Sequence, residues 1–390
     1  MKRWVYFIFV LLLSLKVQHA SGTIRLQNGL LYNTETNSTM PYKAVSMWYA
    51  SLLGESKKEN VRQRLVKELD FLQQMGVNVV EVLAGVQVKC IPAQDSTQNA
   101  HGIVHTLVSE KSCFRGMDFL LSELKQRNMW AVINLDRSPC YDLQRQRLYG
   151  QFVEKWLTHK NALTNVAYID DANILAWKVC DDTQTGGDSL QLYTAWVKQC
   201  VERIKQTDKE HLVMASFQPL RCEAENDAKA LSTFTSETGV DCVEVALSPC
   251  AQGWINWGSI IEGMPHVFLQ LDDRLTAYNR TMSMVERPYI VSVEYPRDAH
   301  FTRPGTSCSA RNTFYEYVGL RANECRSNSE AFVGLSIKGW GGMAKPNSLG
   351  VWNDAAEFTS EYADEMKGEY SVFNADEQTI DLLTKQFKQE

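Results

Sequence analysis

The sequence lacks concentrated positive charge and lacks grouped metal ligands. Lys and Arg number 40 against 46 Asp and Glu, giving a net charge of −6, and no basic stripe runs along the chain. A nucleic-acid partner is therefore not expected. No Cys-x-x-Cys or Cys/His group has zinc-site spacing, so neither a metal nor a cofactor is predicted. Repeats, low-complexity segments and an evident linker are also missing, which predicts a single folded domain.

Long apolar runs are missing beyond the N-terminus. The chain starts with the charged residues Lys2 and Arg3, continues as an apolar run over Trp4–Leu15, and reaches small residues at Ala20–Gly22. This order is typical of a secretory signal peptide, and the run is shorter than the ~20 residues that a membrane span needs. The sequence predicts a signal peptide over residues 1–20 and a secreted, extracellular domain over residues 21–390, without a membrane partner.

The mature part contains ten cysteines, an even count that predicts disulfide bonds in a secreted chain, with a connectivity that spacing leaves open. Two sequons, at Asn37 and Asn279, are candidate N-glycosylation sites. Nothing in the sequence indicates an oligomer, and a monomer is expected.

Short β-rich apolar runs alternate with longer helical patterns. The clearest helix covers Asn60–Met75, where apolar residues recur at helical spacing and Gly76 follows as a stop signal. Eight strands alternating with helices predict an α/β fold, a parallel (β/α)₈ TIM barrel. The expected strands are Lys43–Trp48, Val77–Leu83, Trp130–Leu135, Ile174–Val179, His211–Phe217, Val240–Leu247, Tyr289–Val293 and Phe332–Lys338.

Two adjacent carboxylates, Asp181 and Asp182, follow the expected strand Ile174–Val179. Barrel enzymes place catalytic residues at the C-terminal ends of their strands. The pair is therefore a candidate catalytic site, although Asp182 could equally be a solvated loop carboxylate or a helix cap.

Several segments between about Ile24 and Leu383 stand in a characteristic order and spacing. They include Met47–Gly54, Arg64–Val80, Asp170–Trp177, Ile204–Val213, Tyr295–Asp298 and Gly339–Gly342. Together these segments resemble the secreted β-1,4-mannanases of glycoside hydrolase family 5.

The resemblance implies a retaining hydrolase with two glutamates, an acid/base after the fourth strand and a nucleophile after the seventh. At the first position this chain has Asp182, whose side chain is one methylene shorter than Glu. At the second, alternative alignments place Val293 or Ser292, and Glu294 is the nearest carboxylate. An offset of one residue turns a strand side chain to the other face, unless a bulge or kink re-aims it.

The supporting positions differ as well. Glu81 stands where the family has an Arg, Ala246 where it has a His, and Lys338 where it has a Trp. One alternative to chemistry is that Glu81 and Lys338 pair across the cleft. Glu294 could likewise pair with Arg297 or Lys338.

Aromatic residues at strand ends are candidates for sugar stacking, with ordinary packing as the alternative. These candidates are Trp48, Tyr49, Trp254 and Trp340. The resemblance implies a β-mannan-like glycan as partner.

Two functions follow from these features. The first is a catalytically impaired family 5 homologue that binds glycan or serves as an extracellular structural protein. The second is an active retaining endo-β-1,4-mannosidase, with Asp182 as acid/base and Glu294 as nucleophile. A secreted protein acting through another surface of the barrel is a third possibility.

Overall fold

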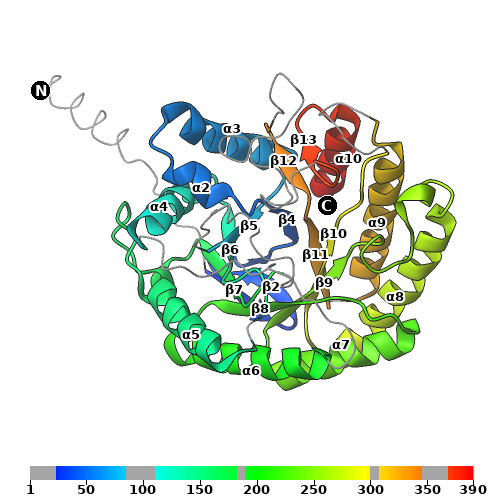
Figure 1. Cartoon of the computed structure of the whole chain (residues 1–390), viewed down its shortest axis with the longest axis horizontal. Coiled ribbons are helices and arrows are strands. Elements are labelled where there is room, and N and C mark those ends of the chain that lie inside the picture. The colour runs from blue at the N-terminus through cyan, green and yellow to red at the C-terminus, as the bar shows by residue number, and fades with distance from the viewer. Residues whose placement is uncertain are drawn as a thin grey trace, which may run out of the picture.

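Eight parallel strands close into a barrel surrounded by helices, as Figure 1 shows. The computed structural model describes residues 23–84, 110–139, 141–181, 189–298, 307–329, 331–344 and 368–389. The barrel strands are β4 (Tyr42–Ser46), β5 (Val79–Leu83), β6 (Trp130–Asn134), β7 (Ile174–Lys178), β8 (Leu212–Phe217), β9 (Cys242–Leu247), β10 (Tyr289–Val293) and β11 (Phe332–Ile337). The predicted (β/α)₈ fold is confirmed, and each expected strand matches one of these.

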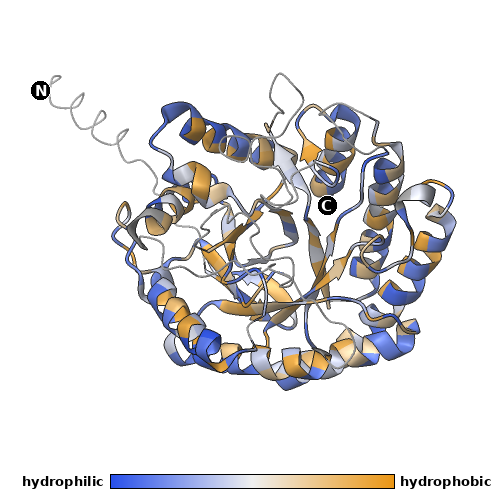
Figure 2. Cartoon of the chain, in the orientation of Figure 1, coloured by the Kyte–Doolittle hydropathy of each residue, from blue (hydrophilic) through white to orange (hydrophobic). Residues whose placement is uncertain are grey.

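The strands are apolar because both of their faces are buried. Side chains on their outward faces pack against the helices in the larger hydrophobic core. Figure 2 shows the barrel strands coloured mainly as hydrophobic and the helices as mixed. The helices are α2 (Ala50–Glu55), α3 (Glu59–Met75), α4 (Glu110–Gln126), α5 (Leu143–Thr158), α6 (Ser189–Thr207), α7 (Ala224–Thr238), α8 (Met264–Met284), α9 (Ser309–Asn328) and α10 (Glu377–Lys388).

The start and stop of α3 follow the sequence closely. Its buried residues include Leu65, Leu69 and Leu72, which recur at helical spacing. Gly76 then adopts a left-handed conformation with φ 93°, and its N–H bonds back to the last turn. Glycine reaches this conformation without steric cost, so the helix ends there.

A small antiparallel sheet lies at the N-terminal ends of the barrel strands. It consists of β1 (Ile24–Gln27), β2 (Leu30–Asn33) and β3 (Ser38–Thr39). Ile24 and Leu31 join the inner core formed by inward-facing side chains of the barrel. The sheet therefore covers this end of the barrel with apolar side chains.

The C-terminal segment is fastened to the barrel by β13 (Val372–Phe373), which pairs with β12 (Trp340–Gly342), and by α10. Asp376, just before α10, binds the guanidinium of Arg297 through two contacts of 2.6 Å and that of Arg311 at 3.0 Å. All three side chains are fully buried. This part of the chain is thus integrated into the fold.

The expected disulfides are not found in the part of the chain that the structure describes. Its eight cysteines form no disulfide with one another, and Cys90 and Cys140 lie outside the described residues. The expected signal peptide also lies outside them. None of the described helices combines the length and apolar character needed to cross a membrane.

Candidate functional site

Each barrel strand contributes one buried polar residue near its C-terminal end. These residues, the polar layer, are Ser46, Glu81, Asn134, Lys178, Ser216, Glu244, Ser292 and Ser336. Residues two positions earlier, such as Val79, Ala176 and Ile290, belong to the inner core. Because strand side chains alternate, the polar layer also faces the inside of the barrel. Apolar filling therefore gives way to polar groups at the edge where barrel enzymes carry their sites.

Lys178 lies at the centre of this layer and contacts three carboxylates. Its Nζ lies 2.8 Å from Oδ1 of Asp181 and 3.4 Å from Oε2 of Glu81, and it forms a close ion pair with Glu244. Lys338 adds a second ammonium group, 3.2 Å from Glu244 and 3.5 Å from Asp181. We call these five residues the ionic cluster.

Neutral hydroxyl groups donate further hydrogen bonds to the two glutamate carboxylates. The hydroxyl of Tyr42 donates to Oε1 of Glu81 at 2.9 Å, and Ser292 donates to Oε1 of Glu244 at 2.5 Å. Buried charges are tolerated when they are paired and hydrogen-bonded in this way. Together with Tyr42 and Ser292, the cluster links five of the eight barrel strands (β4, β5, β7, β9 and β10) and the segments that follow β7 and β11.

The pKa values of the two buried glutamates are shifted in opposite directions. Burial, and then the neighbouring Glu244, raises the pKa of Glu81. Burial alone would also raise the pKa of Glu244, but Lys178 and Lys338 outweigh it and hold that pKa below its ordinary value. Lys178 is buried, yet Asp181 and the two glutamates raise its pKa. Three carboxylates face two ammonium groups, so a proton on Glu81 makes the cluster neutral.

The carboxylate oxygens of Glu81, Asp181 and Glu244 lie within 4.8 Å of one another, close enough to share a cation. Lys178 contacts all three, so its ammonium group already provides the positive charge that a metal ion would supply. This arrangement suits an internal lysine better than a resident metal.

Of the two predicted catalytic residues, the structure describes Glu294. Asp182 lies outside the described residues, whereas its neighbour Asp181 belongs to the ionic cluster. Glu294 directly follows β10, is half-buried, and donates its backbone N–H to the carbonyl of Leu247 at 3.2 Å. Its charge helps raise the pKa values of Cys250 and Tyr370, after the larger effect of burial. Catalysis by Asp182 and Glu294 stays a prediction.

The groups considered as partners of Glu294 bind other residues as well. Arg297 binds Asp376, and Lys338 contacts Asp181 and Glu244. On β10 itself, Ser292 faces the ionic cluster, whereas Val293 belongs to the larger hydrophobic core between the strands and the helices. The inward position of the seventh barrel strand therefore holds a serine engaged with a glutamate.

Three of the four predicted sugar-stacking rings are buried. Tyr49 and Trp340 have no exposed surface, and both hydrogen-bond Glu68 of α3, at 3.4 and 3.2 Å. Trp48 is 2% exposed and meets Tyr49 edge-on. Trp254 is half-buried, with the guanidinium of Arg274 4.9 Å from its ring centre. Sugar contact by these residues stays a prediction.

Glu81 and Lys338 belong to one charged network, but the described residues show no direct pair between them, because Lys178 and Glu244 lie in between. Sequence reasoning missed these two central residues because both lie inside apolar strands. The available signal was a single charge at an inward position, in Ala-Trp-Lys178 and in Val-Glu244-Val. A charge buried in a barrel strand needs a partner from another strand.

The fold and the polar layer define a (β/α)₈ barrel with a polar edge, and sequence comparison identifies the family. The profile described as "GH family 5 beta-mannosidase-like" matches residues 32–142 and 137–390. The chain therefore belongs to this family.

Curated relatives include two rice enzymes (Oryza sativa subsp. japonica). Mannan endo-1,4-beta-mannosidase 3 is 25% identical over 39% of this chain, and mannan endo-1,4-beta-mannosidase 8 is 27% identical over 27% of it. The matches span only 40% and 35% of the relatives' own lengths.

Solved structures show the same fold over nearly the whole chain. The family 5 mannosidase from Rhizomucor miehei has a TM-score of 0.74 at 16% identity, covering 95% of this chain and 97% of that one. The endo-1,4-beta-mannanase from the same organism has a TM-score of 0.60 at 14% identity, covering 94% and 100%.

Proposed function

We propose that this protein is a secreted, catalytically impaired family 5 homologue that binds a β-mannan-type glycan or serves as an extracellular structural protein. The observation that carries this proposal is the ionic cluster. It places paired charges at three positions of the polar layer, in a barrel whose relatives are named as mannan-hydrolysing enzymes.

Retaining hydrolysis needs one carboxylate free to attack and one carboxyl group able to deliver a proton, with the two ~5–5.5 Å apart. Glu244 is held by two lysines and a serine, which stabilise its charge and lower its nucleophilicity. The neighbouring inward position on β10 is Ser292, which cannot replace a carboxylate nucleophile in this chemistry. These contacts support a barrel that no longer performs retaining hydrolysis.

The glycan part of the proposal rests on relatives. The curated relatives are named as acting on mannan, and the Rhizomucor miehei mannosidase was also solved in complex with mannosyl-fructose. A barrel can lose its chemistry and keep a binding surface, because the two depend on different side chains.

The deciding experiment measures release of reducing ends from β-1,4-mannan, together with binding of mannohexaose by calorimetry. We expect binding without turnover. The comparison uses wild type, Asp182→Ala, Glu294→Ala and the exposed α7 control Glu237→Ala.

Turnover that survives in Glu237→Ala and disappears in Asp182→Ala or Glu294→Ala would overturn the proposal in favour of an active endo-β-1,4-mannosidase. Absence of both turnover and binding would contradict the glycan-binding role and leave the structural one.

A further inference from the structure

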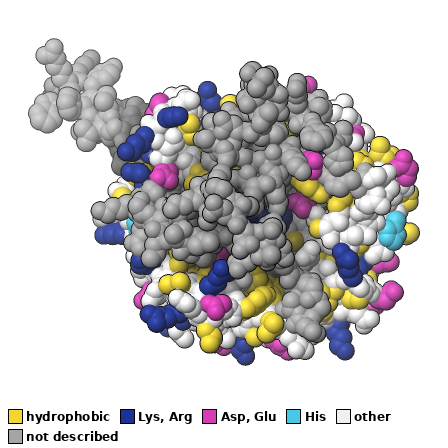
Figure 3. Space-filling model, in the orientation of Figure 1, with side chains coloured by type: hydrophobic (Ala, Val, Ile, Leu, Met, Phe, Trp, Pro, Cys, Tyr) yellow, Lys and Arg dark blue, Asp and Glu magenta, His cyan; other side chains and the backbone are white. Residues whose placement is uncertain are grey.

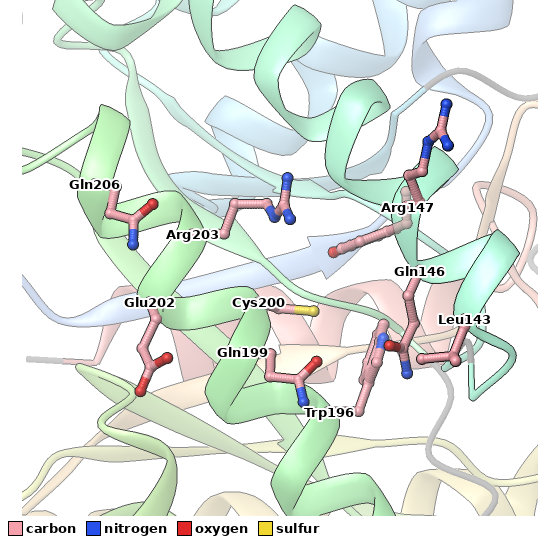
Figure 4. Close-up of a pocket in the computed structure, with 10 residues that line it drawn as sticks. Leu143, Gln146, Arg147, Trp196, Gln199, Cys200, Glu202, Arg203 and Gln206 are labelled. Carbon is pink, nitrogen blue, oxygen red and sulfur yellow. The ribbon is translucent and has the colours of Figure 1, made fainter.

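A groove of about 400 Å³ lies between α5 and α6 on the outer ring of helices. Its floor includes Tyr149 and Trp196, two buried rings whose centres are 5.5 Å apart. Arg147 lines the groove from α5, and Arg203 lines it from α6, as Figure 4 shows. The groove thus has two aromatic rings on its floor and one arginine on each side, and it lies apart from the barrel interior.

A glycine in α5 gives Arg203 its position. A Cβ at Gly150 would lie only 2.3 Å from Nη1 of Arg203, so the guanidinium rests directly over this glycine. Arg147 is three residues before Gly150 and therefore lies on the same face of α5, one turn away. The missing side chain at position 150 lets the guanidinium of Arg203 reach across to α5, the helix that carries Arg147.

These two arginines, like the exposed Arg145 and Arg221, have side chains without an ion-pair partner in the part of the chain that the structure describes. Neither forms a salt bridge or hydrogen bond with any residue that the structure describes, whereas the exposed Arg25 and Arg280 pair with Glu210 and Glu225. Glu202 also lines the groove, but Figure 4 shows its side chain extending from α6 away from that of Arg203. The positive charges on the two sides of the groove are left for a group from outside.

We propose that the α5–α6 groove binds an oxyanion, a carboxylate, phosphate or sulfate carried by a polar ligand such as an acidic saccharide. Guanidinium groups match the planar geometry of these anions and form charge-assisted, often bidentate hydrogen bonds. Gln199 and Gln206 supply amide groups along the same groove, suited to hydroxyl groups on the rest of the ligand.

The test titrates the full-length protein with glucuronate, inorganic phosphate and inorganic sulfate at constant ionic strength, followed by NMR chemical shifts. Saturable binding of at least one probe is expected, weakened roughly tenfold or more by Arg147→Ala or Arg203→Ala because each removes a charge-assisted contact. Arg280→Ala removes the same charge elsewhere and should bind as wild type. The probe with the highest affinity identifies the anion.

Gly150→Ala separates geometry from charge. It keeps both arginines and the helix, but its methyl group displaces Arg203, so binding should weaken without any change in net charge. Equal binding by wild type, Arg147→Ala and Arg203→Ala would overturn the proposal. So would an equal loss in Arg280→Ala, which would indicate nonspecific attraction.

Discussion

At the scale of single residues, the barrel interior shows how position decides the state of a carboxyl group. Glu81 and Glu244 are both fully buried, and both contact Lys178. Glu244 also has Lys338 and therefore a lowered pKa, whereas Glu81 has Glu244 as a close negative neighbour and a raised pKa. One glutamate thus serves as the anion, and the other is the natural place for a proton.

This asymmetry predicts opposite pH dependences for two variants. The raised folded-state pKa of Glu81 stabilises the fold at low pH, and this contribution is lost as pH rises from its unfolded pKa, roughly 4.3, through the raised value. Glu81→Gln imitates the protonated form, so its thermal midpoint should fall less than that of wild type as pH is raised from about 4 to 8.

The matched variant Glu244→Gln should behave in the other direction. Because the folded-state pKa of Glu244 is lowered, its contribution exists above the unfolded pKa and is lost as pH falls through the lowered value. The variant should lose ~3–5 kcal/mol near neutral pH and approach wild type in acid. Parallel melting curves for wild type and Glu81→Gln across this range would contradict the assignment.

At the scale of elements, the sequence predicts barrel strands well and short peripheral strands poorly. Tyr289–Val293 was predicted with the bounds that β10 has, because a strand buried on both faces is a continuous apolar run. The β1–β2–β3 sheet was missed, since its strands are short and partly exposed. The ionic cluster was predicted only in part, because contacts between distant strands depend on register, which a single sequence does not contain.

The attachment of α10 gives an element-scale prediction. Asp376→Asn removes the charge that holds two buried guanidinium groups, which should cost ~3–5 kcal/mol and raise amide hydrogen exchange throughout α10. Asp381→Asn makes the same chemical change at an exposed position of the same helix and should alter stability by less than ~0.5 kcal/mol. Equal exchange in both variants would show that α10 is held by its apolar face alone.

At the scale of the whole molecule, the two ends of the barrel are built differently. The N-terminal end is covered by apolar side chains of the β1–β2–β3 sheet, whereas the polar layer lies toward the opposite edge. On the face shown in Figure 3, acidic and basic side chains of the described residues are interspersed around the rim. Binding through this surface would therefore depend on local groups more than on a field of one sign.

The two sequons test both secretion and the fold, because they lie in very different places. Asn37 is exposed in the turn before β3. Asn279 lies within α8, is 8% exposed, and donates its amide Nδ2 to the carbonyl of Cys325 at 3.1 Å. Since a glycan attaches at this nitrogen, the folded structure favours modification at Asn37 and disfavours it at Asn279.

We expect the chain secreted from animal cells to carry one N-linked glycan and to start after Ala20. Thr39→Ala and Thr281→Ala each destroy one sequon without altering either asparagine. Thr39→Ala should migrate like enzymatically deglycosylated wild type, and Thr281→Ala like untreated wild type. A mobility change in Thr281→Ala would mean that Asn279 is modified before α8 packs against α9, and retention of all forms inside the cell would contradict secretion.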